Sequence, residues 1–180
     1  DQSVNLTKGP LTLMRCNGTQ GCNLVQLKHN FDHEEMYGEN YGYRSGLNSS
    51  MVEHLRSKVE KIEKSIDLKD RDLIIDIGSN DATTLNAYKN KKLQFCGIDP
   101  TGKKFKEFYG KEIALISDFF SLQIFKKHFG TQKARVVTSF SMFYDLQDPI
   151  SFSKEIKSIL KDDGIWITEQ SYMPSMIEAN

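Results

Sequence analysis

The residues best suited to chemistry in this sequence are acidic side chains around a single glycine. The segment Asp76-Ile77-Gly78-Ser79-Asn80-Asp81-Ala82 follows a short apolar run and precedes an amphipathic stretch. At this turn of a doubly wound sheet, a glycine lets the backbone approach a ligand, and free N–H groups of the following helix face the cleft. A dinucleotide fingerprint, G-x-G-x-x-G, needs three glycines, whereas this loop has one. Because Asp76 and Asp81 flank Gly78, the loop favours an amine-bearing or cationic ligand over a pyrophosphate.

Two further acids are expected at the ends of the next two strands. Asp99, followed by Pro100, ends an apolar run, and a carboxylate there can accept both hydroxyls of a ribose. Asp118 could accept from an adenine amino group while Phe119 or Phe120 stacks on the ring. Asp118 could equally cap the next helix, and the two phenylalanines could equally belong to the core. Together, the acids at the three strand ends match S-adenosylmethionine better than NAD.

The elements that must position these acids are short apolar runs alternating with amphipathic stretches from about Arg71 onward. This alternation is typical of βαβ units and predicts an α/β fold with a parallel, doubly wound sheet. The expected strands are Leu73–Ile77, Leu93–Ile98, Glu112–Ile116, Ala134–Ser139 and Ile165–Thr168.

Helices are expected between these strands and before the first of them. One follows Ser79, one covers 121–129, and one begins at Asp148-Pro149 and stops at Gly164. Before the sheet, the spacing of Ser50 and Glu53 is that of a capping box and opens a helix that extends to Ile66.

Composition narrows the class of protein. The 180 residues carry 24 Lys+Arg and 24 Asp+Glu, so the chain lacks the field of a general nucleic-acid or membrane-surface binder. No run is as long and apolar as a membrane span and residues 1–10 do not read as a signal peptide, which favours a cytoplasmic protein. Three cysteines make a disulfide framework improbable.

We expect residues 1–48 to form a loop-rich N-terminal lobe and residues 49–180 to form the cofactor domain.

Beyond the acidic loop, two stretches give the chain a resemblance to the class I methyltransferases. Within that superfamily the sequence resembles the sugar C-methyltransferases that act on nucleotide-linked deoxy-4-ketosugars. The resemblance runs from about Leu13 to the last residue, and Tyr41-Gly42-Tyr43-Arg44-Ser45-Gly46 is its most specific part. The stretches that carry it are Cys22–Leu27, Met36–Asn48 with Met51 and His54-Leu55, Ser141–Pro149, Asp163–Ile167 and Glu169–Met173.

The resemblance implies S-adenosylmethionine as methyl donor and a small-molecule acceptor, a nucleotide-linked sugar, with no nucleic-acid or membrane partner. The implied reaction, part of deoxysugar biosynthesis, removes a proton next to a ketone and methylates the resulting enolate. Tyr43 is the candidate catalytic residue, although a lone tyrosine is a poor base at neutral pH. The cofactor contacts expected from the loop and the resemblance are Tyr41, Ser45, Asp76, Gly78, Ser79, Asn80, Asp81, Asp99, Pro100, Asp118, Phe119, Ser139 and Phe140.

The sequence departs from the family pattern in two places. The family has an N-terminal zinc site with two C-x-x-C pairs, whereas only Cys16 and Cys22 are present here. His29 and His33 could complete a ligand set with them or be ordinary surface residues, and we predict no metal. In the family, a Glu-His stretch that supplies the base, and the last strands of the sheet, follow the segment that ends at Asn180. The chain is therefore expected to be a fragment of an enzyme.

Three alternative functions remain open. The first is a module that binds S-adenosylmethionine without catalysis, and the second is a methyltransferase for another small molecule. The third is a Rossmann-like oxidoreductase, which the missing glycines of the loop disfavour.

Overall fold

The chain forms two compact units in a computed structural model that describes residues 9–38 and 41–179. The first unit is Asp1–Asn40 and the second is Tyr41–Asn180. This division falls after residue 40, whereas the sequence-based prediction places the domain boundary after residue 48. The backbone N–H groups of Ser45 and Gly46 donate to side chains of the second unit, which is why residues 41–48 belong to it.

The first unit consists of short elements. Strands β1 (Leu13–Arg15) and β2 (Val25–Leu27) pair antiparallel. Helix α1 (His33–Tyr37) begins at Asp32, whose carboxylate accepts a hydrogen bond of 2.7 Å from the backbone N–H of Glu34. None of the residues in these three elements is buried.

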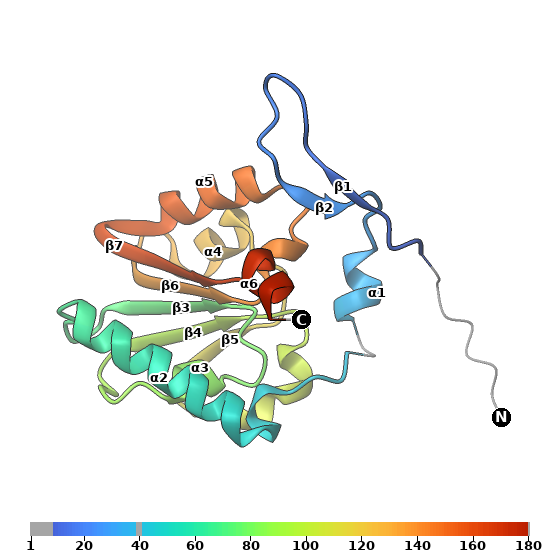
Figure 1. Cartoon of the computed structure of the whole chain (residues 1–180). Coiled ribbons are helices and arrows are strands. Elements are labelled where there is room, and N and C mark those ends of the chain that lie inside the picture. The colour runs from blue at the N-terminus through green and yellow to red at the C-terminus, as the bar shows by residue number, and fades with distance from the viewer. Residues whose placement is uncertain (1–8, 39–40, 180) are drawn as a thin grey trace. The chain divides into compact units, whose positions relative to one another are not determined.

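The second unit contains a five-stranded parallel sheet, as the sequence predicts. Its strand order is β5-β4-β3-β6-β7, so the chain starts in the centre, proceeds to one edge and then crosses to the other side (Figure 1). The direction of progress reverses between β3 and β6, and ligands of such sheets bind outside the carboxyl ends of the strands at this switch point. The strands are β3 (Leu73–Ile77), β4 (Gln94–Ile98), β5 (Ile113–Ile116), β6 (Ala134–Phe140) and β7 (Leu160–Glu169).

Helices cover both faces of this sheet (Figure 1). Helices α2 (Ser49–Ser65) and α3 (Thr83–Asn86) pack on one face, where Ile74 of β3 belongs to the same apolar cluster as their side chains. Helices α4 (Leu122–Phe129) and α5 (Pro149–Ile159) pack on the other face, with Ile75. This alternation follows from the two-residue period of a strand. The remaining elements are the 3₁₀ turns η1 (Ser45–Leu47), η2 (Gly102–Phe108) and η3 (Phe143–Asp145), and helix α6 (Met173–Glu178).

Two helix ends differ from the sequence-based expectation. The cap of α2 is Asn48, whose side chain accepts from the backbone N–H of Ser50, so the predicted capping box at Ser50 is wrong. Helix α5 ends at Ile159 instead of Gly164 because β7 begins at once. Ala134 pairs with Leu160 and Val136 with Ile165, so residues 161–164 bulge out of the strand opposite a single residue of β6.

None of the helices in the described part of the chain is long and apolar enough to cross a membrane.

Candidate functional site

The loop after β3 adopts the conformation expected of a ligand-binding turn. Gly78 has a φ of +75°, which glycine adopts without strain, and its N–H donates to the carbonyl oxygen of Ile98 at 2.9 Å. Asn80 and Ala82 also have positive φ values, 49° and 60°. Because these values are not helical, α3 starts only at Thr83 and is shorter than the sequence suggests.

Asp99 joins this loop to the end of β4. Its side chain is buried, and Oδ2 accepts a hydrogen bond of 2.8 Å from the backbone N–H of Asn80. Oδ1 accepts from the backbone N–H and the hydroxyl of Thr101, at 2.7 and 2.6 Å. A carboxylate has about four acceptor positions, so about one remains on Oδ2 for a ligand hydroxyl. The carboxylate therefore fits a ribose through one hydroxyl more readily than through two.

Asp76 lies below the loop, in the interior. It is 3% exposed, and its Oδ1 accepts a hydrogen bond of 2.6 Å from the hydroxyl of Thr138 on β6. Burial, with a smaller contribution from the negative charge of Asp99, raises the pKa of Asp76 to about 7. A cationic group placed next to this carboxyl would favour its ionised form.

Residues 41–47, which we call the strap, are hydrogen-bonded to the loop. The backbone N–H groups of Ser45 and Gly46 donate to Asn80 Oδ1 at 2.9 Å and to Asp81 Oδ2 at 2.8 Å. In return, the Asn80 amide donates to the carbonyl oxygen of Tyr43 at 3.0 Å. The side chains of Asn80 and Asp81, expected to face the cofactor, thus hold the strap in place.

The aromatic residues of the strap lie side by side above this contact. The rings of Tyr41 and Tyr43 meet edge to face at 6.5 Å, and Tyr43 is 47% exposed. Burial raises the pKa of Tyr41, and the negative charge of Asp99 raises it further. The Lys104 ammonium donates to the carbonyl oxygen of Tyr41 at 2.7 Å, which ties the start of the strap to η2.

Of the other residues expected at the cofactor or beside it, some are engaged in the interior and others are at least partly exposed. Ser139 is fully buried, and its hydroxyl oxygen accepts from the Trp166 indole at 2.9 Å, so this side chain is engaged within the sheet. Phe119 is 39% exposed, and the preceding Asp118 accepts from its backbone N–H at 2.7 Å. Phe120 packs against Phe152 in the core, at 5.3 Å between ring centroids. Pro100 and Phe140 are partly exposed at the ends of β4 and β6.

Sequence reasoning missed Tyr109, which supports the loop from below. Its hydroxyl lies 2.7 Å from the Ser79 hydroxyl and donates to the carbonyl oxygen of Asn80 at 2.9 Å. Gly97 leaves room for this pair, since a Cβ there would lie 2.4 Å from Ser79 Oγ and 2.8 Å from the Tyr109 ring. No sequence motif marks Tyr109, because it follows an irregular 3₁₀ segment.

In the first unit, Cys16 and Cys22 lie close together. Hydrogen bonds from the backbone N–H of Leu24 and from the Cys16 thiol lower the pKa of Cys22. Within residues 9–38 and 41–179, no three His, Cys, Asp or Glu side chains are grouped as a metal site requires.

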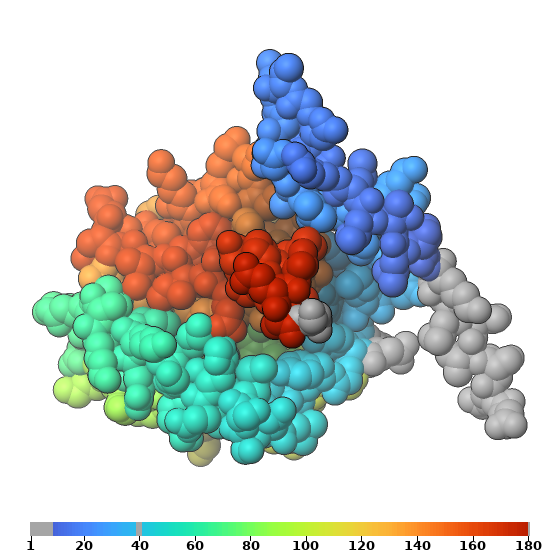
Figure 2. All heavy atoms as spheres, in the orientation of Figure 1, coloured from blue at the N-terminus to red at the C-terminus, as the bar shows by residue number. Residues whose placement is uncertain are grey.

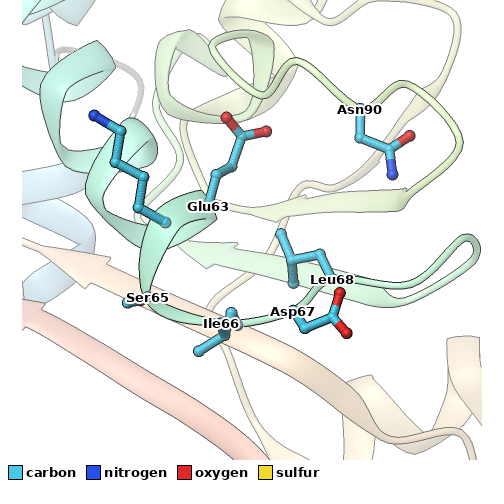
Figure 3. A pocket seen from close by; sticks show the side chains of 7 residues that line it. Glu63, Ser65, Ile66, Asp67, Leu68 and Asn90 are labelled. Carbon is cyan, nitrogen blue, oxygen red and sulfur yellow. The ribbon is translucent and has the colours of Figure 1, made fainter.

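A shallow hollow of about 450 Å³ lies where α2 ends, on the way to the amino end of β3. Glu63, Asp67 and Asn90 are among its polar lining residues (Figure 3). It is therefore at the opposite end of the sheet from the loop and the strap, and it has no part in the candidate site.

Comparison with known proteins identifies the architecture. The plantazolicin methyltransferase BpumL, solved with S-adenosylhomocysteine, superposes with a TM-score of 0.54 at 14% identity, covering 70% of this chain and 48% of that one. A precorrin-6y C5,15-methyltransferase from Geobacter metallireducens superposes with a TM-score of 0.51 at 14% identity, covering 80% of this chain and 75% of that one. The chain has a Rossmann-like methyltransferase fold. The fold expected from the sequence is thereby confirmed.

A sequence relative adds a more specific likeness to this methyltransferase fold. The chain is 23% identical over 182 aligned residues to the C-methyltransferase NovU of Streptomyces niveus. The alignment covers the whole chain but 42% of the length of NovU. No protein-family model matches the chain.

Proposed function

We propose that this chain binds S-adenosylmethionine at the carboxyl ends of β3 and β4 and belongs to a methyltransferase. The observation that carries the proposal is the bond of 2.8 Å between the Asn80 N–H and Asp99 Oδ2, which joins the glycine loop to the acid of the next strand. The two groups meet beside the switch point of the sheet, where ligands of doubly wound folds bind.

The residues present fit the parts of this cofactor. Asp99 retains an acceptor position for a ribose hydroxyl, and Asp76 offers a carboxyl whose ionised form an ammonium group would stabilise. Phe119 is exposed after β5 and could stack on the adenine. When bound, S-adenosylmethionine supplies a methyl group that its sulfonium makes electrophilic. The protein must then supply position, a base and charge stabilisation.

For the acceptor, we propose a carbon next to the ketone of a nucleotide-linked deoxysugar. The support is the likeness to a protein named as a C-methyltransferase and the strap segment, on which the resemblance to sugar C-methyltransferases is most specific. Tyr43 is exposed beside the loop, where it could contact such a substrate.

Calorimetric titration with S-adenosylhomocysteine tests the cofactor assignment. We expect saturable binding in the micromolar range and no binding of NAD. Binding of NAD without S-adenosylhomocysteine would instead indicate an oxidoreductase. Transfer of a labelled methyl group to a nucleotide-linked deoxy-4-ketosugar tests the acceptor. Binding of S-adenosylhomocysteine without methyl transfer to this sugar would favour a binding module.

A further inference from the structure

Asp76 occupies the switch point of the sheet. It pairs with Gly97 of β4 on one side and with Thr138 of β6 on the other. It lies two residues before Gly78, whose loop forms part of the proposed cofactor site. Ligands of doubly wound sheets bind outside the carboxyl ends of the strands at this point, so a bound cofactor lies next to Asp76.

The surroundings of the Asp76 side chain are apolar or carry hydroxyl groups. Ile74, on the same face of β3, packs with residues of α2 and α3 in one apolar cluster. Figure 2 shows the side chains of α2 as a continuous layer on this face of the molecule. Asp76 is 3% exposed, and its hydrogen-bond partners are the hydroxyl groups of Thr138 and Thr84.

No positive charge compensates this buried carboxyl. None of the ion pairs formed within residues 9–38 and 41–179 includes Asp76. An ionised carboxylate without a cation is costly in the interior of a protein, and such a group keeps its proton instead.

The hydrogen bonds of Thr138 also suit a protonated Asp76. Thr138 Oγ1 lies 2.6 Å from Asp76 Oδ1 and 3.3 Å from the carbonyl oxygen of Ile75, but a hydroxyl has one proton to donate. A protonated Asp76 can donate to Thr138 Oγ1, which leaves the hydroxyl proton for Ile75. An ionised Asp76 takes the hydroxyl proton itself, so the neutral form allows one hydrogen bond more.

The titratable neighbours of Asp76 are Asp99, Tyr88 and Tyr109. Burial, and to a smaller extent the negative charge of Asp99, raises the pKa of Asp76 to about 7. Burial raises the pKa of both tyrosines, so they are neutral at that pH. Since none of these groups is a cation, the positive charge that would ionise Asp76 must come from a ligand.

We propose that Asp76 selects amine-bearing ligands by proton release: it is a neutral acid until an ammonium group binds beside it, and it then ionises. This inference rests on the proposed function and adds a specificity-determining residue to it. The O–H bond of the carboxyl breaks, its electron pair stays on the carboxylate, and the proton passes to water. The ammonium group keeps its three hydrogens and pairs with the carboxylate. A ligand without an ammonium group leaves Asp76 protonated.

Calorimetric titration in two buffers of different ionisation enthalpy measures the protons released on binding. With a pKa of about 7 for Asp76, S-adenosylhomocysteine should release about 0.9 proton at pH 6 and about 0.1 at pH 8. Its affinity should be about tenfold higher at pH 8, because binding at pH 6 must first remove the proton. A nucleoside thioether without the ammonium group, 5′-deoxy-5′-methylthioadenosine, should release no proton and bind equally at both pH values.

The decisive variant is Asp76→Asn, whose amide has the shape of the neutral acid but does not titrate. Its binding of S-adenosylhomocysteine should release no proton and should lose the tenfold dependence on pH. The matched control is Asp162→Asn, at an exposed position of β7, which should release as many protons as the wild type.

Two results would overturn this role of Asp76 and leave the proposed function intact. One is binding of S-adenosylhomocysteine to the wild type at pH 6 without proton release, and the other is the same release by Asp76→Asn or with the nucleoside. Absence of S-adenosylhomocysteine binding at both pH values would instead overturn the proposed function. The comparison of the two ligands uses the wild type, so it decides even if Asp76→Asn does not fold.

Discussion

Asp99 is used both by the fold and by the proposed ligand site. Three of its acceptor positions bind the protein itself, through Asn80 and Thr101. Its position at a strand end could be predicted from the sequence, because the apolar run before it ends there. Its partners could not, since they depend on how the following loops fold back. A ligand contact inferred from sequence is therefore also a support of the loop.

Replacing Asp99 should affect both roles. We expect Asp99→Ala to weaken binding of S-adenosylhomocysteine by about 1–3 kcal/mol, because the ribose loses a charged acceptor. Calorimetry measures the affinity, and urea unfolding monitors the accompanying loss of stability. Asp162→Ala, at an exposed position of β7, is the control. Unchanged affinity in Asp99→Ala would mean that the carboxylate serves the loop alone.

Asp76 should make stability depend on pH. Its folded pKa of about 7 lies above the value of about 3.9 for an unfolded aspartate, so the native state retains a proton that the unfolded state releases. The free energy of unfolding should therefore fall as pH rises between about 4 and 7, by up to about 4 kcal/mol.

The asparagine side chain of the Asp76→Asn variant does not titrate. The free energy of unfolding of this variant minus that of the wild type should therefore increase as pH rises from about 4 to about 7. Urea unfolding of both proteins at pH 4.5 and pH 8 measures this difference, from which the other titrating groups cancel. A difference that does not change with pH would show that Asp76 is ionised throughout.

At the scale of elements, the strands agree with the sequence better than the helices do. Each expected strand of the sheet is present because a buried parallel strand is a continuous apolar run. Helix ends depend on contacts that sequence does not display. Asn48 caps α2 because it follows η1, and Gly164 lies in β7 because pairing with β6 continues past it.

The glycine of β4 allows a close approach between two elements. We expect Gly97→Ala to lower the free energy of unfolding by about 1–3 kcal/mol, because its methyl group would push Ser79 away from Tyr109. Binding of S-adenosylhomocysteine should weaken with it. The control is Gly110→Ala, where a Cβ would lie 3.7 Å from the nearest atom, Asn86 Oδ1. Equal stability of the two variants in urea would contradict the proposed crowding.

At the scale of the whole molecule, the α/β class and the position of the switch point could be predicted from the order of the elements. The division into units could not be predicted to the residue. The strap has no periodicity of its own, and it belongs to the second unit through backbone bonds to Asn80 and Asp81.

The second unit should fold and bind ligand by itself. Both clusters of buried apolar residues lie within residues 41–180, as do the loop, the strap and Asp99. A protein comprising residues 41–180 should therefore unfold cooperatively and bind S-adenosylhomocysteine within about threefold of the full chain, a difference of under 1 kcal/mol. A non-cooperative transition in urea would show that the first unit is needed for folding.

The central position of β3 also bears on how fast the protein can refold. Strand β3 pairs with β4 on one side, where Leu73 lies opposite Gln94, and with β6 on the other, where Ile74 lies opposite Val136. The hydrogen bond between Asp76 and Thr138 of β6 joins residues 62 positions apart in the sequence. Such contacts form only after a large loop has closed, and closing the loop costs conformational entropy before the contacts stabilise the chain. Proteins dominated by contacts of this kind therefore fold slowly. The βαβ half that contains β3 and β4 can form early. The other half, which brings Thr138 to Asp76, must wait for the chain to return across the sheet.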